Sequence, residues 1–419
     1  PPDAVRIEEM LNYFNNNYNA PTGDKLFDVQ TVITNCAWNP ANQLLFVNIS
    51  SRKIALDSLP PANLVFLIDV SGSMDMPNRL PLLQSAFRLL VNNLRDKDTV
   101  SIVVYGGVVG TMLNPTGGAE KEKILKAIDE LTPGGSTPGE SGIRMAYRLA
   151  ASHYIKGGNN RVILATDGDF NVGLKKDEEL EDLIARHRHS GIYLTCLGVG
   201  MGNFKDSKIQ TLARKGNGNY AYLDSYQEAE KVLLEEFTQT LYAVADNVFM
   251  NIVFNPAFVK EYRLIGFDNK MGALRDTLSV MEGGEFGSGQ SVIAAFEITP
   301  VEKGKFAATP EADHYAEIDL QFKKPQRDTI LSAKYACPYH VIPFEYLDSS
   351  YKFSTAVMMF GTLLKQSPFA KTINWSDMIT LTSQAMENGN LSQQDFLALV
   401  QEAKLLYSRY HKKKKKMGW

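Results

Sequence analysis

The sequence contains little cysteine. Its 419 residues include three, Cys36, Cys196 and Cys337, and they are far apart along the chain. A disulfide framework and a structural zinc site normally use paired or closely spaced cysteines, so we expect neither here. Cys196 lies inside the apolar run Ile192–Val199 and is expected to be part of a core. Cysteine usage therefore leaves the cellular compartment open.

Long apolar runs and a strong net charge are also missing. No run approaches the roughly 20 apolar residues that a transmembrane helix requires. The formal net charge of −3 provides no overall basic field, so a nucleic-acid partner is not expected. With 44% hydrophobic and 22% charged residues, the composition is that of a folded globular protein rather than a disordered chain. At roughly 100–200 residues per domain, the length predicts two or three domains.

The two ends of the sequence allow one expectation each. The first residue is Pro1 rather than Met, so we expect any export signal or lipid anchor to precede the sequence. A membrane contact is then expected only through such an anchor. Near the other end, the five lysines Lys412–Lys416 are typical of a solvated tail. An acidic lipid surface is the alternative interpretation of this run.

The residue patterns divide the chain into four parts. The first combines a short amphipathic helix with two strands, Phe27–Ile33 and Gln43–Ile49. The second alternates continuous apolar runs with helical spacing, which predicts a doubly wound α/β domain with a parallel sheet. The third returns to strands without helices, and the fourth has two helical patterns, Phe353–Leu364 and Gln393–Tyr410. The predicted boundaries are 1–60, 61–243, 244–340 and 341–419.

The predicted fold is an α/β domain inserted into a β-sandwich-like domain and followed by a helical C-terminal region. The strands of the first and third parts would belong together, and the insertion would lie between neighbouring strand ends. The glycine-rich stretch Gly283–Gly289 predicts a loop. Spacing also predicts a helix over Gln227–Leu241 and a polar connection around Trp375 between the two C-terminal helices.

The segment Leu67–Met74 has the most informative polar pattern. An apolar strand ends in Asp69, and Ser71 and Ser73 follow at offsets of two and four. Gly72 lies between the two serines and lets the backbone turn sharply. One carboxylate and two hydroxyls should therefore converge above the end of this strand. These hard oxygen donors suit Mg²⁺, Mn²⁺ or Ca²⁺ rather than zinc.

Two further segments are expected to end near the same place. Residues 134–138, Gly-Gly-Ser-Thr-Pro, form a glycine-rich turn that presents Thr137, and a second apolar strand ends just before Asp167. In a doubly wound sheet, ligands bind at the carboxyl ends of the strands where the strand order reverses. The strand ending at Asp69 is counted first in the domain and the one before Asp167 fourth. In the common order 3-2-1-4-5-6 these two strands flank the switch point.

These segments closely resemble the von Willebrand factor type A domain and its metal-ion-dependent adhesion site. The pattern of that family is Asp-x-Ser-x-Ser, then a Thr, then an Asp. The five matching residues are Asp69, Ser71, Ser73, Thr137 and Asp167. Segments 2–9, 160–173 and 262–267 extend the likeness, because they are similar to a bacterial von Willebrand A family of YfbK type. That resemblance covers nearly the whole chain.

The resemblance implies a function in recognition. In this class the five residues hold a divalent cation, most often Mg²⁺, with Ca²⁺ or Mn²⁺ as alternatives. Neutral hydroxyls leave the cation under-neutralised, and an Asp or Glu carboxylate of a partner protein supplies a further ligand. The resemblance thus implies a protein-binding, non-enzymatic role. Family members commonly carry an export or lipoprotein signal, which implies a location in the cell envelope, with the cytoplasm as the alternative.

Two other function classes stay open. Some bacterial von Willebrand A proteins present clients to AAA-type ATPases, so the chain could be an accessory subunit of such a machine. A metal-dependent phosphoesterase is the other alternative. That chemistry usually requires more carboxylates and a nearby base than this pattern provides.

Overall fold

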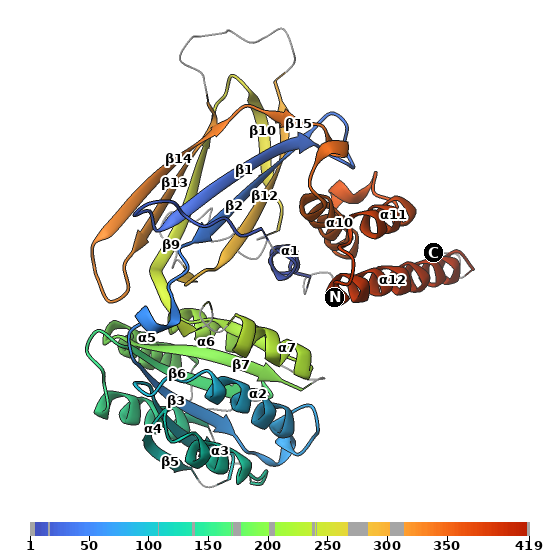
Figure 1. Cartoon of the computed structure of the whole chain (residues 1–419). Helices are drawn as coiled ribbons and strands as arrows, with labels where there is room; N and C mark the ends of the chain where they lie inside the picture. Colours follow the sequence, from blue (N-terminus) through green and yellow to red (C-terminus); the bar gives the residue numbers. More distant parts are fainter. Residues whose placement is uncertain are drawn as a thin grey trace.

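The middle part of the chain folds around one six-stranded sheet (Figure 1). The computed structural model describes residues 5–15, 17–107, 109–135, 139–168, 170, 177–200, 206–236, 239, 241–266, 284–301 and 314–416. The sheet has the order β5-β4-β3-β6-β7-β8. Its strands are β3 (Ala62–Asp69), β4 (Thr99–Tyr105), β5 (Gly110–Gly117), β6 (Asn159–Thr166), β7 (Ile192–Val199) and β8 (Tyr220–Leu223).

The strand order places a switch point between β3 and β6. Counted within this domain, the order is 3-2-1-4-5-6, the common order that was assumed in locating the switch point from the sequence. β3 pairs in parallel with both β4 and β6, and β5 is an antiparallel edge strand. The carboxyl ends of β3 and β6 therefore lie side by side, and chain segments that follow them can meet there.

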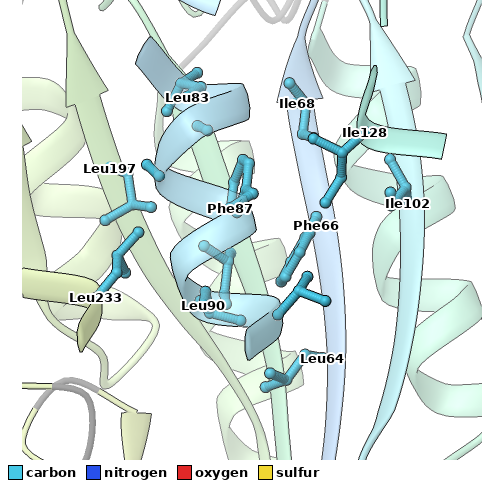
Figure 2. Close-up of a cluster of buried hydrophobic side chains, with 14 of the residues drawn as sticks. Leu64, Phe66, Ile68, Leu83, Phe87, Leu90, Ile102, Ile128, Leu197 and Leu233 are labelled. Carbon is cyan, nitrogen blue, oxygen red and sulfur yellow. The ribbon is translucent and has the colours of Figure 1, made fainter. Parts of the chain in front are cut away.

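Helices cover both faces of this sheet because residues along its strands alternate between the two faces. Leu64, Phe66 and Ile68 of β3 pack under α2 (Figure 2). The rings of Phe66 and Phe87 stack with their centroids 4.4 Å apart. Val65 and Leu67 point the other way, into the core under α4. The helices are α2 (Leu80–Asn92), α3 (Lys121–Asp129), α4 (Gly139–Ser152), α5 (Asp177–His189), α6 (Asp206–Lys215) and α7 (Tyr226–Glu230).

Two further sheets form one β domain around a shared core. The first has the order β10-β12-β2-β1-β15 and the second β11-β9-β13-β14. Side chains of both sheets, such as Val47 and Ile318, belong to the same buried cluster. The strands are β1 (Phe27–Asn35), β2 (Gln43–Ser51), β9 (Ala243–Phe254), β10 (Val259–Leu264), β11 (Gly284–Gly287), β12 (Ser291–Pro300), β13 (His314–Lys323), β14 (Ile330–Pro338) and β15 (Val341–Ile342).

The α/β domain is an insertion in this β domain. β2 precedes it in the sequence and β12 follows it, yet the two strands pair, with Phe46 opposite Ala295. The predicted fold class is therefore confirmed. Figure 1 shows the α/β domain joined to the β domain at one end of its sheet, with the arrow of β3 pointing away from the junction.

A buried ion pair lies at the junction of the two domains. Arg161 of β6 donates to both carboxylate oxygens of Glu285 in β11. The two side chains are 0% and 1% exposed. Arg161 also donates to Thr195 of β7 at 2.7 Å. Nearby, a cavity of about 420 Å³ is lined by both chain connections, at Pro60 and Tyr242.

The helical region packs on the outside of the first β sheet. α1 (Ile7–Tyr13) contacts α10 (Ser349–Leu364), and the side chains of both belong to a core that also contains Phe46. α11 (Trp375–Ala385) and α12 (Leu391–Lys416) complete this region. Among the described residues, no helix combines the length and the apolar character needed to cross a bilayer.

The structure corrects the sequence predictions at several elements. The strand β11 lies in the stretch predicted as a glycine-rich loop, and α11 lies in the predicted polar connection. The helix predicted over Gln227–Leu241 comprises α7 and a π-helical turn, Lys231–Glu235, and β9 begins at Ala243. The edge strand β5 and the strand β14 were not predicted.

Candidate metal centre

Asp69 ends β3 and is held by three donors from neighbouring elements. Its Oδ1 accepts the Ser71 backbone N–H at 2.9 Å, and its Oδ2 accepts hydrogen bonds from the Tyr105 hydroxyl at 3.1 Å and the Thr166 hydroxyl at 3.2 Å. Tyr105 ends β4 and Thr166 ends β6, so the carboxylate connects the ends of three adjacent strands. The residue is 2% exposed.

Burial sets the electrostatics of this group. It raises the pKa of the Asp69 carboxyl, the hydrogen bonds from Ser71 oppose that rise, and the charge of Asp167 adds to it. Burial, reinforced by the charge of Asp69, also keeps the pKa of the Tyr105 phenol well above its ordinary value. A cation bound at the switch point would offset both the burial of Asp69 and its repulsion by Asp167, so a cation is favoured there.

Ser71 and Ser73 present their hydroxyls beside this carboxylate. Their Oγ atoms are 3.0 Å apart, and Ser73 is exposed. Mg²⁺ binds six oxygens at about 2.0–2.1 Å in octahedral geometry, so neighbouring ligand oxygens are about 3 Å apart. The two hydroxyls have this spacing without rearrangement. The donor chemistry and the distance thus both fit a hard divalent cation.

Asp167 follows β6 at the same end of the sheet. Arg79 Nη1 lies 2.7 Å from Asp167 Oδ2 and also donates to the Ser73 carbonyl oxygen at 2.6 Å. The Asp167 side chain is 5% exposed and that of Arg79 is 17% exposed. One guanidinium therefore connects the segment after β3 with the segment after β6.

Two glycines let three loops approach this point. Gly106 has φ +108°, and a Cβ there would lie 2.3 Å from the Ser71 backbone nitrogen. Gly135 has φ +82°, and a Cβ there would lie 2.5 Å from the Cα of Gly107. Side chains at either place would push the loops apart. The Gly72 backbone N–H donates to the carbonyl oxygen of Gly135 at 3.1 Å, which fixes the loop after β3 against the segment before α4.

The structure brings four of the five predicted residues together: Asp69, Ser71, Ser73 and Asp167. Thr137 lies outside the described residues, although the adjacent Gly135 reaches the site. Sequence reasoning missed Tyr105, Thr166 and Arg79. The first two are polar side chains at strand ends, a signal that could have identified them. Arg79 had no such signal, because its approach depends on how α2 begins.

Three family descriptions match consecutive parts of the chain. Residues 63–239 match "von Willebrand factor type A domain", and residues 239–406 match "Uncharacterized protein YfbK, C-terminal". Residues 1–46 match a family described as "von Willebrand factor". The matched parts include the inserted domain and most of the β domain and helical region.

Similar proteins agree with these matches. The chain is 35% identical over 425 residues to the uncharacterized protein YfbK of Escherichia coli (strain K12), which covers 96% of this chain and 73% of that protein. It is also 25% identical to human inter-alpha-trypsin inhibitor heavy chain H2, over 46% of this chain and 21% of that protein.

A solved structure supports the fold alone. The von Willebrand factor type A protein from Catenulispora acidiphila superimposes with a TM-score of 0.51 at 12% identity, over 92% of this chain and 90% of that one. The von Willebrand A match, residues 63–239, spans the strands of the six-stranded sheet that contains the switch point. From the extent of the match to YfbK and the match to its C-terminal family, we conclude that this chain belongs to the YfbK family of von Willebrand factor type A domain proteins.

Proposed function

We propose that this protein recognises a partner protein through a divalent cation held at the switch point. The observation that carries the proposal is the pair of Ser71 and Ser73 hydroxyls, 3.0 Å apart beside two carboxylates. Von Willebrand A domains commonly bind such a cation, and the chain belongs to that family. Mg²⁺ fits the oxygen spacing, and Ca²⁺ or Mn²⁺ are the alternative ions.

The proposed site residues have different roles in binding the cation. Ser71 and Ser73 offer neutral hydroxyl oxygens directly. Asp69 already accepts three hydrogen bonds, so it holds the loop and contributes negative charge from behind the hydroxyls. Thr137 and Asp167 complete the set. When bound, the cation supplies a positive centre that attracts one further anionic ligand, and the proposed ligand is a partner's Asp or Glu carboxylate.

Calorimetric titration of Mg²⁺ and Ca²⁺ into chelator-stripped protein tests the site. We expect saturable binding that is lost in Asp69→Asn and in the double variant Ser71→Ala/Ser73→Ala. Asp75→Ala is the matched control, because Asp75 is exposed in the same loop and should leave binding unchanged. Equal cation binding by the wild type and both site variants would overturn the metal assignment.

Partner capture tests the recognition step. Immobilised wild-type protein should retain a protein partner in Mg²⁺ and release it in chelator, and Asp69→Asn should not retain it. Full retention by Asp69→Asn in the presence of chelator would show that recognition uses another surface. Calorimetry and partner capture together distinguish a failure of the metal site from a failure of the recognition role. Cation binding without metal-dependent capture would contradict only the second.

A role as a subunit of a larger machine is the second candidate. The chain is 26% identical to the magnesium-chelatase 67 kDa subunit of Chlorobaculum parvum, over 40% of this chain and 29% of that protein. The alternative of an accessory subunit that presents clients to an AAA-type ATPase comes from the von Willebrand A resemblance, and this likeness to a protein named as a subunit is compatible with it. Recovery of an ATPase as the metal-dependent partner would favour it over adhesion.

Hydrolysis of phosphoesters is the less favoured alternative. Among the described residues, no group of three or more His, Cys, Asp or Glu side chains is placed to hold a metal. A hydroxyl-rich donor set favours ligand exchange over hydrolysis, which usually employs more carboxylates and a base. Turnover of phosphoester substrates with Mg²⁺ or Mn²⁺ that disappears in Asp69→Asn would replace the recognition proposal.

A location in the cell envelope is part of the proposal and rests on the family resemblance. Cell fractionation with an antibody against the chain checks it directly. Recovery in the soluble cytoplasmic fraction would favour the accessory-subunit role.

A further inference from the structure

The last helix, α12, begins in a core and ends beyond it. Phe396, near its start, packs against Phe14, Phe353 and Phe360 with ring centroids 5.1–5.4 Å apart. Further along, the ring of Tyr407 lies 5.4 Å from that of Trp375. The helix then continues for nine more residues to Lys416, about 13 Å at 1.5 Å per residue. Figure 1 shows α12 at the outer edge of the helical region.

Apolar side chains of α12 also face solvent. Leu399, Leu405 and Leu406 are 52%, 59% and 56% exposed, respectively. Leu399 and Leu406 are seven residues apart, so they share one side of the helix, and Leu405 adjoins them. Val400, which lies about 100° around the helix from Leu399, is fully buried. Besides its buried face, α12 therefore has exposed leucines that no described residue covers.

The charge of α12 changes abruptly along its length. The last acidic residue is Glu402, and residues 403–416 contain seven Lys or Arg and no Asp or Glu. The five lysines Lys412–Lys416 extend over more than one helical turn. We call residues 403–416 the basic tip. A strongly basic, partly apolar helix end is unusual in a chain whose net charge is −3.

We propose that the basic tip docks on the surface of an anionic lipid bilayer. An interfacial helix binds there by placing apolar side chains at the boundary between headgroups and acyl chains, while Lys and Arg attract the anionic headgroups. Leu405 and Leu406 supply the first component and the lysines the second. Exposed leucines favour a lipid surface over a nucleic acid, since phosphates gain nothing from them.

Vesicle co-sedimentation tests this proposal independently of the metal site. The 419-residue chain, kept in chelator, is mixed with vesicles of phosphatidylcholine alone or with about a third phosphatidylglycerol. We expect binding to the anionic vesicles at least tenfold tighter than to the neutral ones, weakening as salt rises. Equal partitioning to both vesicle types, or no binding to either at low salt, would overturn the proposal.

Two variants separate the electrostatic contribution of the lysines from the apolar contribution of the leucines. Replacement of Lys412–Lys416 by Gln should weaken binding at least tenfold, because each lysine near an anionic surface contributes severalfold. Leu405→Ser/Leu406→Ser should weaken it severalfold at unchanged charge. Lys123→Gln/Lys126→Gln, which removes exposed lysines of α3, is the control and should bind as the wild type does. Thermal unfolding midpoints of all four proteins are compared, and Leu405, Leu406, Lys123 and Lys126 are exposed, so their replacement should leave the midpoint unchanged.

A duplex DNA fragment is the competing probe. DNA binding as tight as vesicle binding, and unchanged by Leu405→Ser/Leu406→Ser, would show a phosphate-binding tail and overturn the lipid assignment. Weak DNA binding together with the leucine effect on vesicles would support it.

Discussion

Arg79 and Asp167 form an ion pair at the proposed cation site, with Nη1 2.7 Å from Oδ2. The same nitrogen donates to the carbonyl oxygen of Ser73, whose hydroxyl is a proposed ligand. A guanidinium in this place holds the ligand loop and at the same time opposes a second positive charge. The site thus contains its own competitor for Asp167.

Removing that competitor should strengthen cation binding. We expect Arg79→Gln to raise the Mg²⁺ affinity about tenfold, since a charge-assisted hydrogen bond contributes roughly 1.5–3 kcal/mol and about 1.4 kcal/mol corresponds to a factor of ten. Calorimetric titration measures this. Arg88→Gln, on the exposed side of α2, breaks the exposed pair with Asp129 and should have no effect. Weaker Mg²⁺ binding by Arg79→Gln would instead assign Arg79 a positioning role.

The close contact between the loop after β4 and the ligand loop after β3 should depend on Gly106. Gly106→Ala would place a Cβ against the Ser71 backbone at a positive φ, so the ligand loop must shift. We expect loss of Mg²⁺ binding and a decrease of about 1–3 kcal/mol in the free energy of unfolding. Gly134→Ala is the control, because a Cβ there meets no atom within 4 Å. Unchanged Mg²⁺ affinity in Gly106→Ala would show that the loop position is not critical.

The junction between the domains should be sensitive to its buried charges. Arg161→Met alone leaves Glu285 buried without its partner, and Glu285→Leu alone does the same to Arg161. Each single change should lower the free energy of unfolding by about 3–5 kcal/mol, and the double variant should recover most of that loss. Urea unfolding measures all three. Additive losses in the double variant would show that the two side chains do not act as a pair.

The cysteines should be chemically inert in the folded protein. All three are buried and unpaired, and burial raises the pKa of the Cys36 thiol to about 12 and that of Cys196 further. The thiolate is the reactive form, so a disulfide reagent at pH 8 should label none of them until denaturant is added. Rapid labelling of one thiol in the native protein would contradict the packing around it.

The sequence predicted the elements whose burial is uniform. The apolar run Ile192–Val199 is the strand β7 with the same bounds, because a strand buried on both faces is mostly apolar along its length. β5 was missed because it is an exposed edge strand that contains Pro115 and two terminal glycines. β14 alternates between half-buried and exposed residues, so its period of two was a signal that could have been used.

The candidate site divides in the same way. Asp69 ends one apolar strand and Asp167 follows another, and the two strands are neighbours in the sheet, so the strand order brings the two residues together. Arg79 could not be predicted, because its contact with Asp167 depends on the path of the chain between η3 (Gly72–Met74) and α2.

The strand β11 was predicted as a loop because glycine-rich segments usually turn. Gly287, however, lies where a Cβ would meet the Gln239 carbonyl oxygen at 1.9 Å. Close packing rather than turning explains that glycine.

The inserted domain is attached to the β domain at the amino-terminal end of its central strands, and the candidate metal centre lies at their carboxyl-terminal end. Both connections, at Pro60 and Tyr242, border the amino ends of β3 and β6, while the ligands follow the carboxyl ends. A partner bound at the ligands and pulled away would therefore load β3 and β6 along their length. The ladder bonds between parallel strands would then be sheared together rather than opened one at a time. A pull on the proposed metal centre would thus be carried along the sheet to the attachment at its other end.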